Sequence, residues 1–140
     1  MKQAIGLFTL LIVLTQSRMY VPKKSLYIGE TCGSNYYFQV SNFTANPWPP
    51  VLGQSMLVEM SGIFDQLANV SVIGIGQSLS GQSWNYTTVK VNQIFSAGQS
   101  QTFSTVISAG NNPGYCYLQY ALKNQDDMFL ACWHLQYQLF

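Results

Sequence analysis

Charge is the scarcest property of this sequence. Lysine, arginine, aspartate and glutamate together make up 8% of the 140 residues, and the formal net charge is +1. A surface with so little charge carries no field that would attract nucleic acid or a strongly acidic partner. We therefore expect no nucleic-acid partner.

Groups that carry out catalysis are also few. His134 is the only histidine, and it shares a strand face with glutamines, where a surface or structural role is usual. Asp126 and Asp127 fall in a short turn, where the backbone favours aspartate. The other carboxylates show no spacing typical of a carboxylate pair or a metal cage, and no nucleophile motif occurs. We predict neither catalysis nor a metal or cofactor site.

Long apolar runs are missing outside the N-terminus. The run over residues 4–14 follows Lys2, and the small polar residues 15–17 come next. A basic start, a short apolar segment and a small-residue exit are typical of a secretory signal peptide. The alternative is a membrane anchor, but a spanning helix needs roughly 20 apolar residues. We predict that residues 1–17 are a cleaved signal peptide.

Three N-glycosylation sequons agree with a secretory route, at Asn42, Asn69 and Asn85. Asn42 raises a question of strand geometry, because it shares the parity of Phe38 and Val40, which should face inward. Either the strand bends before Asn42, or that sequon is unoccupied. We favour the bend, since a β-bulge changes the parity of a strand.

Helical periodicity is almost absent, and short β-prone segments alternate with turn residues. This spacing predicts one all-β domain, an antiparallel β-sandwich of about seven strands. The expected strands span residues 36–43, 55–64, 70–75, 86–91, 101–107, 115–122 and 128–139.

Alternation along these segments separates an apolar face from a polar face. In the last segment, for example, Trp133 and Leu135 lie on one side, and His134 lies on the other. The pattern does not separate a filled core from a hollow one. The inward residues are predicted to be Phe38, Met56, Val58, Met60, Phe64, Phe103, Ile107, Leu118, Tyr120, Trp133, Leu135 and Tyr137.

The three cysteines leave one thiol unpaired within a monomer. Cys116 lies on an apolar strand face, which predicts a buried thiol. Cys32 precedes the first strand and Cys132 lies in the last, so the two can be neighbours in a sandwich. Pairing of Cys116 with Cys132 is the rival, although the two are offset across the predicted hairpin. Both pairings stay open at this point.

Several segments occur in an order that resembles a known family. They are Cys32, the connection 46–54 with its Asn-Pro-Trp-Pro-Pro sequence, the Asn-Pro-Gly-Tyr of 112–115, and the closing Leu-Ala-Cys-Trp of 130–133. Over residues 31–140 the chain resembles the ML family, the MD-2-related lipid-recognition domains, and most closely its Niemann-Pick type C2-like branch. The resemblance implies an immunoglobulin-like β-sandwich and a Cys32–Cys132 bridge. The cysteines of the family's other two disulfides are missing here.

The resemblance also implies a function. The protein is expected to be a secreted or lysosomal monomer that binds or transfers a sterol, phospholipid or fatty acyl chain between its sheets, with transient membrane or receptor contact. The twelve inward residues would then line the pocket, and Trp48, Pro49 and Val51 would edge its entrance. The alternative is an immunoglobulin-like adhesion or receptor-binding module with a solid core.

Overall fold

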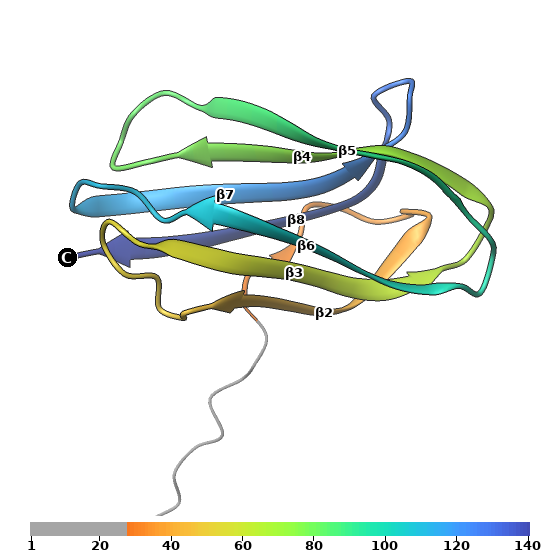
Figure 1. Cartoon of the computed structure of the whole chain (residues 1–140), viewed down its shortest axis with the longest axis horizontal. Helices are drawn as coiled ribbons and strands as arrows, with labels where there is room; N and C mark the ends of the chain where they lie inside the picture. Colours follow the sequence, from red (N-terminus) through yellow and green to blue (C-terminus); the bar gives the residue numbers. More distant parts are fainter. Residues whose placement is uncertain (1–27) are drawn as a thin grey trace, which may run out of the picture.

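Eight antiparallel strands form the part of the chain that the computed structural model describes, residues 28–140 (Figure 1). The predicted signal peptide lies outside these residues. No helix occurs among them, and hence none that could cross a bilayer. The strands are β1 (Glu30–Thr31), β2 (Phe38–Asn46), β3 (Ser55–Phe64), β4 (Ala68–Ser78), β5 (Asn85–Phe95), β6 (Ser100–Ser108), β7 (Gly114–Lys123) and β8 (Phe129–Leu139).

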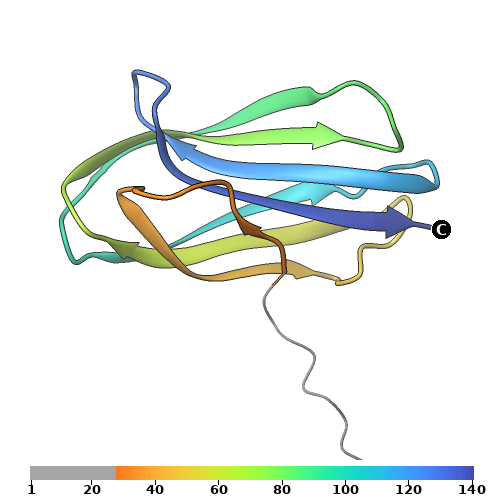
Figure 2. The same cartoon turned by 180° about the vertical axis from the view of Figure 1, so that it is seen from behind.

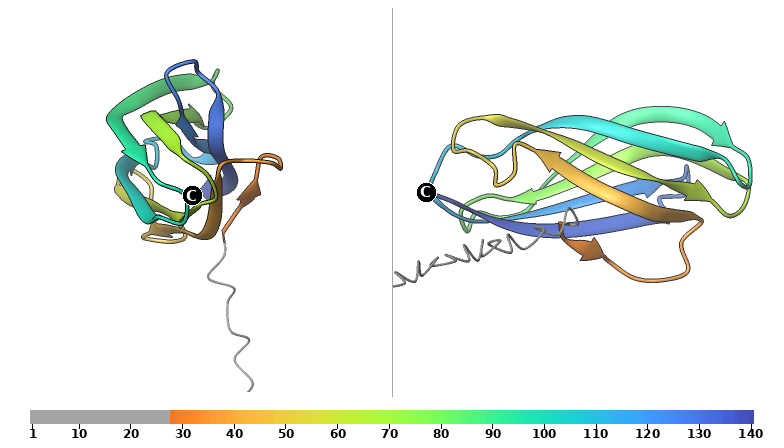
Figure 3. Two further views of the ribbon diagram at one scale, coloured as in Figure 1. Left: turned by 90° about the vertical axis from the view of Figure 1, so that its right-hand side faces the viewer. Right: turned by 90° about the horizontal axis from the view of Figure 1, so that it is seen from below.

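The strands lie in two sheets that face each other, as the end-on view of Figure 3 shows. One sheet has five strands in the order β1-β8-β7-β4-β5, and the other has three in the order β2-β3-β6. Each sheet contributes one apolar face to the space between them. The expected all-β antiparallel sandwich is confirmed.

Each of the seven expected segments forms a strand, and β3 has the predicted bounds. The eighth strand, β1, was not predicted, because two residues carry no alternation. It pairs with β8, with Glu30 opposite His134 and Thr31 opposite Trp133. Figure 2 shows β1 and the loop that leads from it into β2. The beginning of the described chain therefore lies against its end.

The bend expected in the first long strand is present. The register between β2 and β3 shifts between Val40 and Asn42, which is a β-bulge with Ser41 as the extra residue. Phe38 is buried before the bulge, and Asn42 is exposed after it. The other two sequon asparagines, Asn69 and Asn85, are also exposed. Glycosylation at the three positions stays a prediction.

A disulfide joins Cys32 to Cys132, with Cα atoms 5.3 Å apart. The Cys32 amide also donates a hydrogen bond to the Cys132 carbonyl at 3.0 Å. Cys116 is a free, buried thiol. It could not have been the partner, because alternation puts it on the inner face of β7 while Cys132 points to the outer side of β8. The pairing implied by the family resemblance is confirmed.

Removal of this disulfide should destabilise the protein strongly, because the bridge spans 100 residues of sequence. In the chain-entropy model a loop of this length is worth up to roughly 4–5 kcal/mol. We expect the double variant Cys32→Ala/Cys132→Ala to lose a few kcal/mol of unfolding free energy in urea denaturation. Cys116→Ala keeps the bridge and is the matched control. An equal loss in both variants would contradict the expectation.

Candidate functional site

The space between the two sheets holds all the side chains that were predicted to face inward. All twelve are buried. They come from β2, β3, β6, β7 and β8, so both sheets contribute to one apolar interior. Their burial confirms the predicted faces, and their contact with a lipid stays a prediction.

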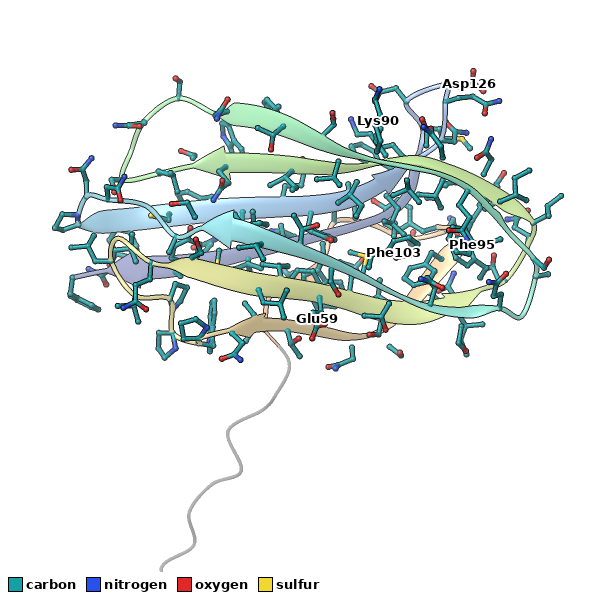
Figure 4. All side chains as sticks on the ribbon, viewed as in Figure 1. Glu59, Lys90, Phe95, Phe103 and Asp126 are labelled. Atoms are coloured by element: carbon teal, nitrogen blue, oxygen red, sulfur yellow. A yellow bond between two sulfur atoms is a disulfide. The ribbon has the colours of Figure 1, made fainter. Side chains whose placement is uncertain are left out.

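One end of the interior is a cluster of four phenylalanines. The Phe64 ring lies 4.7 Å from the rings of Phe38 and Phe95, measured between centroids, and Phe103 meets Phe95 edge-on at 5.5 Å. Figure 4 shows the labelled Phe95 and Phe103 between the two layers. Phe95 was missed from the sequence because it ends a strand, β5, whose other residues are mostly exposed.

The middle of the interior is an aromatic stack that joins the sheets. Phe43 of β2 lies 5.5 Å from Trp133 of β8 at an interplanar angle of 14°, and it meets Tyr120 edge-on at 5.8 Å. The Trp133 indole donates a hydrogen bond to the Ile28 carbonyl at 2.7 Å. Phe43 was not among the predicted residues, because its parity relative to Phe38 depends on the bulge between them.

Two phenols place polar groups inside this apolar space. The Tyr120 hydroxyl lies 3.0 Å from the Thr105 hydroxyl across the sandwich, and the Tyr137 hydroxyl donates to the Ala109 carbonyl at 2.9 Å. Burial raises the pKa of Tyr120 to about 12 and is also the main cause that raises the pKa of Tyr137 to about 12. Both phenols are therefore neutral at physiological pH. They could offer hydrogen bonds to a polar group of a buried ligand without introducing charge.

A crevice of about 270 Å³ opens where β2 approaches the Trp133 region of β8. Its floor includes Phe38, Val40 and Trp133, and much of its rim is formed by Thr31 of β1 and by residues 33–36 of the polar loop that follows. Sequence reasoning did not find this opening. The signal that could have indicated it is Cys32, because its bridge to Cys132 holds the loop beside Trp133.

The predicted entrance lies in the connection that follows the other end of β2. Trp48, Pro49 and Val51 are exposed there, and the peptide bonds Asn46–Pro47 and Trp48–Pro49 are cis. The Trp48 ring meets the buried Tyr137 ring edge-on at 6.4 Å. The structure thus places the exposed Trp48 indole next to an interior residue. The role of this connection as an entrance stays a prediction.

The two buried phenols should appear in an alkaline titration. Folding raises their pKa above the ordinary value of 10, so the native state holds these protons to higher pH than the unfolded chain. Their contribution to stability is complete below about pH 10 and is lost as the pH rises through about 12. Absorbance of tyrosinate should show two groups that ionise last, and Tyr120→Phe and Tyr137→Phe should each remove one. Ionisation of all tyrosines together in the folded protein would contradict this.

No family model and no curated protein matches the sequence. Solved structures do match its fold. A Niemann-Pick type C2 protein from the Japanese carpenter ant is 10% identical, with a TM-score of 0.61 over 81% of this chain and 100% of its own. The C-terminal domain of wzt is 14% identical, with a TM-score of 0.66 over 82% and 81% of the two chains.

A third structure, the alkylpurine DNA glycosylase AlkC of Pseudomonas fluorescens bound to DNA containing an abasic site analogue, is 12% identical. Its TM-score is 0.54 over 77% of this chain and 32% of its own. At these identities the likenesses show the fold alone: the chain has a β-sandwich like that of a Niemann-Pick type C2 protein.

Proposed function

We propose that this protein binds the apolar part of a lipid, a sterol or an acyl chain, between its two sheets. The observation that carries the proposal is the crevice beside β2. It has a polar rim, and its floor includes Phe38 and Trp133, which also belong to the buried interior. A ligand that enters there meets the apolar side chains of both sheets without crossing a strand.

The energetics of the interior favour such a ligand. Burial of apolar surface stabilises a complex by about 25 cal/mol per Å², so an apolar chain needs few polar anchors. Met56 and Met60 lie in the interior, and methionine adapts to irregular shapes more readily than branched residues do. The strands of the two sheets belong to separate hydrogen-bonded ladders. Parting the sheets therefore exchanges side-chain contacts and leaves the ladders intact.

The setting of the proposal is an oxidising compartment. The Cys32–Cys132 bridge is of the kind that persists in secreted proteins, and the fold resembles that of a Niemann-Pick type C2 protein. We place the protein outside the cell or in the lysosomal lumen, as a monomeric carrier without catalytic function. It would meet a membrane or a receptor transiently when it exchanges its lipid.

A second candidate function is an adhesion or receptor-binding module with a solid core. The close packing of the interior favours it, because Phe64 contacts both Phe38 and Phe95 at 4.7 Å and Phe43 stacks on Trp133. A ligand must displace some of these contacts, whereas a module that binds through its surface leaves them unchanged.

Lipid extraction separates the two functions. Protein purified from a lipid-containing host should release close to one lipid per chain into organic solvent, detected by mass spectrometry. Delipidated protein should then take up a fluorescent sterol or a fluorescent fatty acid. Protein that is empty after purification and takes up neither probe is the result that rejects the carrier.

A tryptophan at the crevice should slow uptake. Ser34 is exposed and lines the crevice, so Ser34→Trp would block the opening without entering the core. Ser100→Trp is the matched control, because Ser100 is exposed and lines a polar hollow beside residues of β2, β3 and β6. We expect a several-fold lower uptake rate for Ser34→Trp alone, with thermal stability unchanged in both. Equal rates would argue against this entrance.

Trp48→Ala tests the entrance predicted from sequence. A lower uptake rate in this variant, with a normal rate for Ser34→Trp, would place the opening at the connection between β2 and β3. Met60→Trp fills the interior itself and should lower the amount of lipid bound, whichever opening the ligand uses. Its folding is checked by circular dichroism.

A further inference from the structure

A second hollow lies on the five-stranded sheet, outside the lipid-binding interior. It has a volume of about 210 Å³ and is lined mainly by residues of β4, β5 and β7. The strand registers place Tyr86 of β5, Gly76 of β4 and Gln119 of β7 side by side in one row. Gln119 lies next in sequence to the buried Leu118 and Tyr120, so it points to the opposite face of the sheet. The hollow is therefore a groove on the outer face.

Tyr86 lines this groove and belongs to a group of three exposed aromatic side chains beside it. Trp84 lies 6.0 Å from Tyr86 in a stacked arrangement at 17°, and 6.5 Å from Tyr117 at 41°. Their exposed fractions are 47% for Trp84, 67% for Tyr86 and 40% for Tyr117. We call these three residues the aromatic platform. Since exposure of apolar ring surface to water is unfavourable, a cluster of three rings on one sheet face indicates a contact surface.

Two rings of the platform, those of Trp84 and Tyr86, lie close to Gly76 of the groove. A Cβ atom on Gly76 would lie 2.8 Å from Cε1 of Tyr86 and 3.4 Å from the Trp84 indole. Both rings thus lie over the bare backbone of Gly76, and a larger residue there would push Tyr86 away. This close contact with the Gly76 backbone limits the movement of the two rings, which lowers the conformational entropy lost when a ligand binds.

The groove carries little free charge. Lys123, its one cation, lies 2.9 Å from an Asp127 oxygen and 4.9 Å from the centre of the Phe129 ring. Gln119 and Thr88, which also line the groove, are uncharged donors and acceptors. Among the described residues, the only hydrogen bond of the Gln119 side chain is a long one to Cys32 Sγ at 3.9 Å. A ligand of this groove therefore gains hydrogen bonds and ring contacts but little from ion pairing.

We propose that the aromatic platform and its groove bind an uncharged oligosaccharide. A pyranose ring has an apolar face of C–H groups and a rim of hydroxyls, which match an aromatic ring and neighbouring amide and hydroxyl groups respectively. Adjacent sugars of one chain stack on adjacent members of the platform. The side chains of Gln119 and Thr88 form hydrogen bonds with the sugar hydroxyls that face the groove.

The neighbouring sequon does not occupy this site. Asn85 lies between Trp84 and Tyr86 in the sequence, so its side chain points to the other side of β5. A glycan attached there leaves the platform open to an external saccharide. The groove also stands apart from the lipid site, because the inward side chains of β7, such as Leu118 and Tyr120, lie on the opposite face of the same sheet.

The test is a titration of the full mature protein with mannohexaose, cellohexaose, laminarihexaose and chitohexaose, followed by tryptophan fluorescence and calorimetry. We expect at least one of these neutral probes to bind, with an affinity that does not change when the salt concentration is raised. Trp84→Ala and Tyr117→Ala should each weaken that binding roughly tenfold or more, as truncation of an aromatic anchor does. Thermal denaturation verifies that both variants are folded.

Trp48→Ala is the matched control, because Trp48 is an exposed tryptophan in the connection between β2 and β3. Its saccharide affinity should equal that of the unchanged protein, and Trp84→Ala should take up lipid normally. The proposal is overturned when none of the four saccharides binds, or when Trp84→Ala binds as well as the parent. It is also overturned when sedimentation shows that Trp84→Ala only disrupts pairing of two copies of this chain.

Discussion

The two sheets of this sandwich meet through side chains, because their strands form separate hydrogen-bonded ladders. Apolar packing and a few hydrogen bonds, such as that between Thr105 and Tyr120, keep them together. The aromatic stack of Phe43 on Trp133 lies at the centre of this contact. The contact between the sheets therefore depends on this side-chain packing. Hydrogen-bonded strand pairing between the two layers would hold the sheets together more rigidly.

Much of this fold follows from period-two alternation. The inner faces of β3, β7 and β8 were predicted from alternation, and the bulge before Asn42 from a conflict of parity. Three features could not be predicted from alternation, for physical reasons. β1 is two residues long and pairs with β8 next to the Cys32–Cys132 bridge, a contact between residues far apart in sequence. The crevice and the aromatic platform each combine strands far apart in sequence, and strand register across a sheet is set by tertiary packing.

The five-stranded sheet has different chemistry on its two faces, and β7 shows this within four residues. Leu118 and Tyr120 lie in the apolar interior, while Tyr117 and Gln119 lie on the outer face, where Gln119 lines the groove and Tyr117 contacts Trp84. Successive side chains of a strand point to opposite faces of the sheet. The apolar interior and the outer groove are therefore separated only by the backbone of the sheet. The proposed lipid site and the proposed saccharide site therefore share no side chain.

Two of the three register shifts in the described sheets involve edge strands, and the third lies between β7 and β8, inside the five-stranded sheet. β2 borders the three-stranded sheet and carries its extra residue at Ser41, and β5 borders the five-stranded sheet and carries its own near Asn92, a residue with φ of 49°. Edge strands expose unpaired backbone groups, to which another chain can add a strand. Proteins commonly oppose this with charged side chains. This chain has few charges. At β2 and β5 the bulge interrupts the regular row of backbone amides and carbonyls that an added strand would pair with, so geometry opposes strand addition at these two edges.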